Sequence, residues 1–147
     1  MKKDERPIIL VADDNKEDYQ LAEEAFKEVG ILDSLIWVKN GEELMDYLLL
    51  KGKYKNSKDA PKPSIILLDL NMPKKDGRET LKEIKEHPDL CRIPVIVFTV
   101  SGAEEDINYC YKAGANSYIR KPLNFSQLVD IFRTTAKYWL ETVKLPL

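Results

Sequence analysis

The sequence predicts an α/β protein, a (βα)5 chain that builds a doubly wound parallel sheet of five strands. Two observations predict this class. Short, nearly continuous apolar runs recur along the 147 residues, and a segment with helical spacing of apolar residues follows each run. Continuous apolar runs are typical of strands buried on both faces of a parallel sheet. Alternating strands and helices imply right-handed crossovers, with helices on both faces of the sheet.

The expected strands are four apolar runs and a weaker fifth one, in order Ile8–Ala12, Leu35–Val38, Ile65–Leu68, Val95–Phe98 and Ser117–Arg120. A helix is expected after each strand, because apolar residues recur there on one helical face. These faces lie in Leu21–Val29, Leu44–Leu48, Leu81–Ile84, Ile107–Tyr111 and Leu128–Trp139. Gly30 and Gly114 supply stop signals for the first and fourth helices. Residues 52–64 are expected to form an exposed loop.

The length of the chain predicts one domain over residues 1–147, with a core from about 7 to 140 and no output domain after it. The net charge of -2 provides no basic field for nucleic acid. The longest apolar run, Ile8–Ala12, is far shorter than the roughly 20 residues that span a membrane. No apolar signal-peptide core follows the first residues, and Cys91 and Cys110 lack zinc-site spacing. We therefore expect a soluble, cytoplasmic protein.

Chemically capable side chains follow four of the predicted strands. Asp13 and Asp14 follow the first strand, Asp69 the third, Thr99 the fourth and Lys121 the fifth. Ligands of open α/β sheets bind beyond the carboxyl ends of the strands, where these residues are expected to meet. Any one of them alone is explained by helix capping, strand propensity or surface charge, but their joint placement predicts a site.

Three clustered carboxylates repel one another, so this site requires a cation. An open set of oxygen ligands suits Mg²⁺, which binds one or two carboxylates together with phosphate oxygens. Asp69 could then attack a phosphoryl group as a carboxylate nucleophile. Lys121 and the Thr99 hydroxyl would hold the phosphoryl oxygens.

These residues resemble the receiver domain of two-component response regulators. The resemblance rests on Asp13-Asp14, on Asp69-Leu-Asn-Met-Pro73 with Asp76-Gly77, on Thr99 and on Lys121-Pro122, and it extends from about Pro7 to Trp139. It implies the flavodoxin-like strand order 2-1-3-4-5. The stretches 71–78 and 114–122 also resemble single-domain regulators that partner phytochrome-like histidine kinases.

The resemblance also implies the ligands of the metal. Asp69 becomes the phosphoacceptor and a Mg²⁺ ligand, Asp14 a direct ligand, and Asp13 a ligand mostly through water. The backbone carbonyl of Asn71 completes the set that the protein supplies.

The resemblance further implies a switch. Thr99 is the switch hydroxyl, Lys121 the phosphate-binding lysine, and Tyr118 the aromatic residue that changes rotamer on activation. One departure is Val100, because the residue after the switch threonine is usually small in this family. The expected function is that of a phosphoprotein in a phosphorelay. It receives its phosphoryl group from a sensor histidine kinase and signals by protein contact, with the face of the fourth helix, fifth strand and fifth helix as a dimer surface.

Two other classes of protein, a phosphatase and an electron carrier, also use this architecture. A magnesium-dependent phosphatase of the haloacid-dehalogenase type also uses a strand-end aspartate, but it has an acidic residue two positions later, where this chain has Asn71. A flavodoxin-like electron carrier requires a phosphate-binding loop after the first strand, where the acidic residues 13–18 would repel a flavin phosphate. The sequence therefore favours a signalling module over an enzyme.

Overall fold

Five parallel strands form one sheet in the computed structural model, which describes residues 6–31, 34–56, 58 and 60–146. The strand order is β2-β1-β3-β4-β5, which confirms the predicted order. Each pair of neighbours is parallel. The strands are β1 (Ile9–Ala12), β2 (Leu35–Val38), β3 (Ile65–Leu68), β4 (Val95–Thr99) and β5 (Ser117–Arg120).

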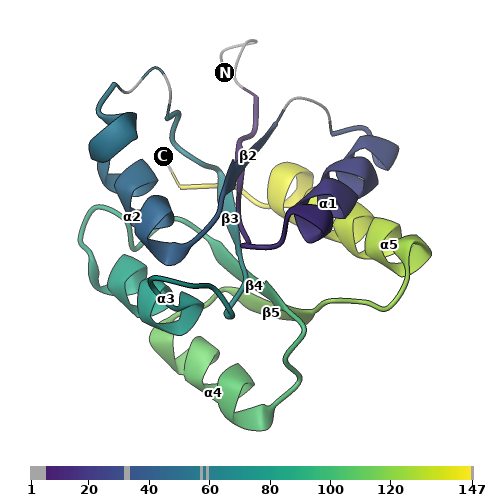
Figure 1. Cartoon of the computed structure of the whole chain (residues 1–147). Helices are drawn as coiled ribbons and strands as arrows, with labels where there is room; N and C mark the ends of the chain where they lie inside the picture. The colour runs from purple at the N-terminus through teal and green to yellow at the C-terminus, as the bar shows by residue number, and fades with distance from the viewer. Residues whose placement is uncertain (1–5, 32–33, 57, 59, 147) are drawn as a thin grey trace.

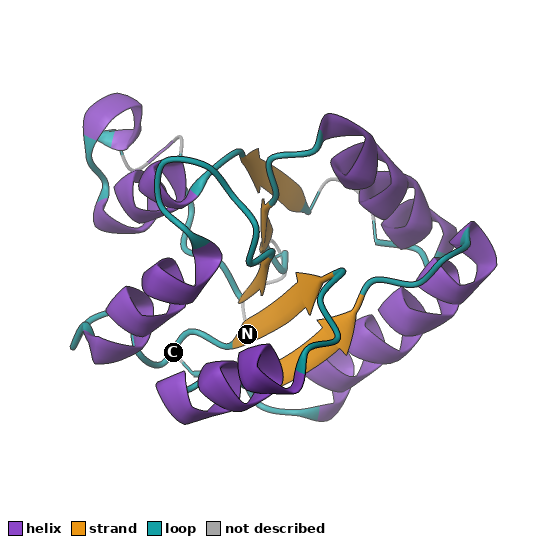
Figure 2. Ribbon diagram, turned by 60° about the horizontal axis from the view of Figure 1, so that its bottom comes forward, coloured by secondary structure: helices purple, strands orange, loops and turns teal. Residues whose placement is uncertain are grey.

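Helices cover both faces of the sheet (Figures 1 and 2). On one face α1 (Lys16–Glu28) and α5 (Phe125–Ala136) lie side by side. The other face is covered by α2 (Gly41–Leu49), α3 (Gly77–Glu86) and α4 (Glu104–Ala113). The predicted doubly wound architecture is therefore confirmed.

The hydrophobic core is divided by the sheet into two layers, which explains the continuous apolar runs. In β1, Leu10 and Ala12 pack toward α2, α3 and α4, whereas Ile9 and Val11 pack toward α1 and α5. Successive side chains of a strand point to opposite faces, so a strand with helices on both sides needs apolar residues at every position. The Phe26 and Phe132 rings stack between α1 and α5, with centroids 4.0 Å apart.

Two strand boundaries differ from the prediction by one residue. The first strand begins at Ile9, because the Ile8 N–H donates to the side-chain hydroxyl of Ser64, at 3.2 Å, and not to a backbone carbonyl. The fourth strand extends through Thr99, so its last residue is the predicted switch threonine.

The segment 52–64 is not simply an exposed loop. It begins with a 3₁₀ helix, η1 (Gly52–Tyr54), and the Tyr54 hydroxyl donates to Glu43 of α2 at 2.7 Å. The Tyr47 hydroxyl donates to the Pro61 carbonyl at 2.6 Å, and Ala60 is buried. Two tyrosines therefore anchor the described part of this segment to α2; residues 57 and 59 lie outside the description.

The last predicted helix is divided in two. The α-helix ends at Ala136, and a π-helical segment, η3 (Lys137–Thr142), carries Trp139 against the α1–α5 core layer. None of the helices in the described residues combines the length and the hydrophobicity that spanning a lipid bilayer requires.

Candidate functional site

The parallel sheet brings the predicted site residues together at the carboxyl ends of its strands. Asp13 follows β1, Asp69 follows β3, and Lys121 follows β5. Carboxylate oxygens of Asp13, Asp14 and Asp69 all lie within 4.8 Å of one another. Asp13 and Asp69 are buried, whereas Asp14 is exposed at the edge of the cluster. The predicted convergence is therefore present.

Lys121 lies beside two members of this acidic cluster, Asp13 and Asp69. Its ammonium donates to Asp13 at 2.8 Å, to Asp69 at 3.1 Å and to Asp18 of α1 at 2.8 Å. The lysine side chain is only 10% exposed, so its contacts with the buried Asp13 and Asp69 are shielded from water. A buried cation of this kind neutralises carboxylates that would otherwise repel one another.

Burial and charge act in opposite directions on the titration of this cluster. Burial raises the pKa of Asp13, and the hydrogen bond and charge of Lys121 offset only part of that effect. For Lys121, burial favours the neutral amine, but the hydrogen bonds to Asp13 and Asp18 outweigh it and raise the lysine pKa. Lys121 is therefore firmly protonated, and the ionised Asp13 is retained at an electrostatic cost that a second cation would relieve.

Asp18 is a site residue that the sequence prediction missed. It lies in the first turn of α1, where its backbone N–H donates to the capping side chain of Asn15 at 2.9 Å. This cap orients the first turn, and the Asp18 carboxylate reaches Lys121. The sequence could have indicated Asp18 by its position, because it lies five residues after Asp13 and about one helical turn beyond the end of the strand.

Thr99 is fully buried at the end of β4. Within the described part of the chain, its hydroxyl oxygen has no hydrogen-bond partner. Buried hydroxyl groups are nearly always paired, because an unpaired one costs about 1–3 kcal/mol. Thr99 therefore offers a donor to a group that enters the site.

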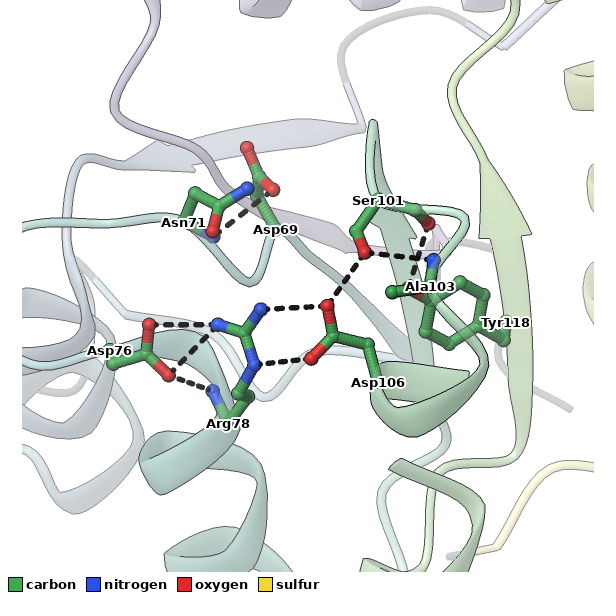
Figure 3. A network of polar contacts seen from close by, with 8 residues as sticks. All are labelled: Asp69, Asn71, Asp76, Arg78, Ser101, Ala103, Asp106 and Tyr118. Carbon is green, nitrogen blue, oxygen red and sulfur yellow. Dashed lines mark hydrogen bonds and ion pairs between the residues drawn. The ribbon is translucent and has the colours of Figure 1, made fainter. Parts of the chain in front are cut away.

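The loop after β3 is packed tightly around Asp69. The Asn71 N–H donates to the Asp69 carboxylate at 3.3 Å (Figure 3). The Gly77 N–H donates to the Leu70 carbonyl at 2.9 Å. A Cβ at Gly77 would lie 2.2 Å from the Asp69 carbonyl oxygen, so only glycine fits where α3 begins.

Tyr118, the predicted switch aromatic, is half-buried on β5 and points toward the loop after β4 (Figure 3). Its hydroxyl donates to the Ser101 carbonyl at 2.9 Å. Val100 of the same loop is 60% exposed, so its branched side chain stands at the solvent edge.

The three carboxylates form an all-oxygen set that could hold a divalent cation. The exposed Asp14 leaves the set open to solvent, as a hard cation that retains water ligands requires. The incompletely offset burial of Asp13 and the Thr99 hydroxyl, unpaired within the described residues, fit a site that accepts a cation and an anionic group together.

Comparison with known proteins identifies the family. The response regulator receiver domain family matches residues 9–133. Response regulator Rcp1 of Synechocystis sp. (strain ATCC 27184 / PCC 6803 / Kazusa) is 45% identical over 139 residues, which cover 95% of this chain and 92% of Rcp1.

Solved structures agree with this match. The phosphorylated cyanobacterial phytochrome response regulator RcpA is 43% identical and superposes with a TM-score of 0.90, covering 97% of this chain and 100% of RcpA. The Mn²⁺-bound form of Rcp1 is 42% identical with a TM-score of 0.87, over 97% of this chain and 100% of that one. The match gives no support to the phosphatase alternative, and the chain belongs to the receiver domain family of two-component response regulators.

Proposed function

We propose that this chain is a phosphorylation-operated switch whose phosphoacceptor is Asp69. The observation that carries the proposal is the convergence of Asp13, Asp14 and Asp69 beside the Lys121 side chain, which is only 10% exposed. In this arrangement a sensor histidine kinase donates the phosphoryl group, and the likeness to phytochrome response regulators supports a phytochrome-like kinase. The two free cysteines suit the reducing cytoplasm, where we place the protein.

Phosphoryl transfer in this site is a displacement at phosphorus. An Asp69 carboxylate oxygen forms the new O–P bond while the P–N bond to the kinase histidine breaks. Lys121 turns from Asp69 toward a phosphoryl oxygen, and the Thr99 hydroxyl donates to another. Because the acceptor is part of the chain itself, the protein acts as a signalling phosphoprotein instead of an enzyme with a separate substrate.

Asp13, Asp14, Asp69 and the Asn71 carbonyl would hold Mg²⁺ in this proposal. When bound, Mg²⁺ offsets the negative charge that accumulates between the carboxylates and the phosphoryl oxygens. Asp13 stays oriented for this role because its carboxylate accepts the Asn15 N–H at 2.9 Å.

The direct test is phosphorylation by a small donor. The full chain is incubated with acetyl phosphate and Mg²⁺, and the adduct is located by mass spectrometry. We expect one phosphoryl group, labile to base, on Asp69, and none when the metal is chelated. A phosphoryl group on another residue, or none with metal present, would reject the proposal.

Asp14→Asn should separate metal binding from stability. Asp14 is the exposed carboxylate of the cluster, and removing its charge relieves repulsion with Asp13 and Asp69. We expect the variant to melt slightly higher without metal. Addition of Mg²⁺ at about ten times its Kd should raise the wild-type melting temperature by about 3 °C and the variant by much less.

The control for this melt is Asp130→Asn, because Asp130 is exposed on α5 and pairs with neighbouring Arg133, away from the carboxylate cluster. It should retain the full response to Mg²⁺. If Asp14→Asn melts lower without metal, Asp14 is a structural residue and the assignment is wrong.

The face formed by α4, β5 and α5 is the proposed output surface. β5 is an edge strand, and α4 beside it carries the exposed rings of Tyr109 and Tyr111. Exposed aromatic side chains favour protein contact. We expect beryllofluoride, which mimics the phosphoryl group, to convert the monomer to a dimer in analytical sedimentation.

Tyr109→Glu should prevent that dimer by placing a charge on the face. Leu50→Glu provides the matched control, because Leu50 is comparably exposed but lies at the end of α2. An unchanged mass of the wild-type protein with beryllofluoride would remove the dimer from the proposal.

A further inference from the structure

A second polar network lies between helices α3 and α4, beside the loop that begins at Asp69 (Figure 3). Arg78 of α3 donates from Nε and Nη2 to the two carboxylate oxygens of Asp106 of α4, at 2.8 and 2.9 Å. The Ser101 hydroxyl donates to the same carboxylate at 2.6 Å. Asp106 therefore joins α3 and α4 to the loop that follows Thr99.

The geometry makes this pair stiffer than an ordinary surface ion pair. The side chain of Asp106 is 17% exposed, and the guanidinium binds its carboxylate in a bidentate manner. Nη1 of Arg78 also donates to Asp76, at 3.1 Å, which fixes the guanidinium plane from the other side. A bidentate, charge-assisted pair of this kind allows little rotation of either side chain. Hydrogen bonds from Arg78 and Ser101 lower the pKa of Asp106, so its carboxylate remains charged at neutral pH.

At one end the network adjoins the phosphoacceptor. Arg78 follows Gly77, whose backbone packs directly against the backbone of Asp69 and Leu70. A displacement of the Asp69 loop therefore moves the base of the Arg78 side chain.

At the other end the network determines the position of Ser101. The Ser101 side chain is held by Asp106, and its oxygen also accepts the Ala103 N–H at 3.3 Å. The carbonyl of the same residue accepts the Tyr118 hydroxyl at 2.9 Å. Ser101 is thus hydrogen-bonded through its side chain to α4 and through its carbonyl to β5.

We propose that the Arg78–Asp106 pair is a clamp that positions Ser101 and thereby keeps the Tyr118 ring turned inward. Through this clamp the start of α3, which packs on Asp69, is coupled to the α4–β5 face. Arg78 and Asp106 are positioning residues, because they act on Tyr118 through the hydrogen bond from Ser101 to Asp106. The link to signalling rests on the proposed function, but the placement of Tyr118 by the clamp does not.

The clamp can be tested in the unphosphorylated protein by fluorine NMR. The chain is labelled with 3-fluorotyrosine, and the Tyr118 resonance among the seven tyrosines is assigned with Tyr118→Phe. Exposure of the ring is measured as line broadening by a water-soluble paramagnetic agent. Asp106→Asn removes the charge of the acceptor, and Arg78→Lys keeps a charge but removes the bidentate fork.

We expect the broadening of Tyr118 to increase about threefold or more in both variants, because a freed Ser101 no longer fixes the hydroxyl acceptor. Arg133→Lys is the matched control, since Arg133 pairs with Asp130 at 3.1 Å on the exposed face of α5. It should leave Tyr118 unchanged. Retained melting transitions show that the variants are folded. Unchanged Tyr118 broadening in folded Asp106→Asn and Arg78→Lys would overturn the clamp.

Failure of the clamp and failure of the proposed function are distinguishable. The fluorine measurement uses no phosphodonor, so it reports the clamp alone. Acetyl phosphate with mass spectrometry reports Asp69 alone, and both clamp variants should accept phosphate there, because neither residue contacts the Asp69 carboxylate in the described structure.

Discussion

Asp69→Asn should reduce phosphorylation by acetyl phosphate to background while the protein stays folded. The amide has nearly the shape of the carboxylate but lacks the anionic oxygen that attacks phosphorus. It can still accept the Asn71 N–H, which now lies 3.3 Å from the carboxylate. Lys121 loses its longest contact, at 3.1 Å, and keeps the two at 2.8 Å to Asp13 and Asp18. We therefore expect a stability change within about 1 kcal/mol.

The matched control for this experiment is Asp18→Asn. It also removes a carboxylate from Lys121, but Asp18 lies outside the cluster of three that could hold a metal. This variant should still be phosphorylated, at a rate within about tenfold of wild type. If Asp69→Asn is phosphorylated as fast as the wild-type protein, the nucleophile has been misassigned. The same conclusion follows if phosphorylation is completely lost in Asp18→Asn as well as in Asp69→Asn.

Much of the fold could be predicted because its strongest signals are local. The runs Ile65–Leu68 and Val95–Phe98 are apolar enough to be strands buried on both faces, and they lie in β3 and β4, where every residue is buried. Once strands are parallel, the residues that follow them must meet at one edge of the sheet. That is why Asp13, Asp69 and Lys121 could be grouped from sequence alone, although Asp13 and Lys121 are 108 residues apart.

Contacts that depend on how two elements pack could not be predicted in this way. Asp18 reaches Lys121 only because α1 starts directly beside the sheet edge. Arg78 and Asp106 are 28 residues apart on different helices, and no spacing rule joins them. Tyr54 likewise anchors η1 to Glu43 through a side-chain hydrogen bond, which the loop-like sequence around Tyr54 does not predict.

Lys121→Met should destabilise the metal-free protein by about 3 kcal/mol at pH 7. The substitution keeps an unbranched apolar stem but leaves Asp13 and Asp69 buried without their cation, and an unpaired buried charge costs about 3–5 kcal/mol. The lower figure applies because water enters a site whose third carboxylate is exposed. Lys53→Met is the matched control. Lys53 pairs with Glu43 at 2.7 Å but is 70% exposed, so its loss should cost less than about 1 kcal/mol.

Lowering the pH should reduce the difference in unfolding free energy between Lys121→Met and the wild-type protein. Burial already raises the pKa of Asp13 above 3.8 in the presence of Lys121, and removal of the cation raises it further. A raised folded-state pKa means that the folded protein binds the proton more tightly than the unfolded chain does. The resulting stabilisation is complete below the unfolded-state pKa and is lost as the pH rises through the folded-state pKa. The variant therefore recovers stability relative to wild type as the pH falls from 7 toward 4.

Mg²⁺ should also reduce this difference in unfolding free energy at pH 7. A divalent cation among Asp13, Asp14 and Asp69 supplies the charge that the lysine no longer provides. Urea unfolding at pH 7 and pH 5, each with Mg²⁺ and with chelator, measures all three effects on one scale. If Lys121→Met costs no more than Lys53→Met, the carboxylates are not held together by Lys121. If its cost is the same at both pH values, Asp13 is not a charge that the lysine neutralises, and the electrostatic account of this site fails.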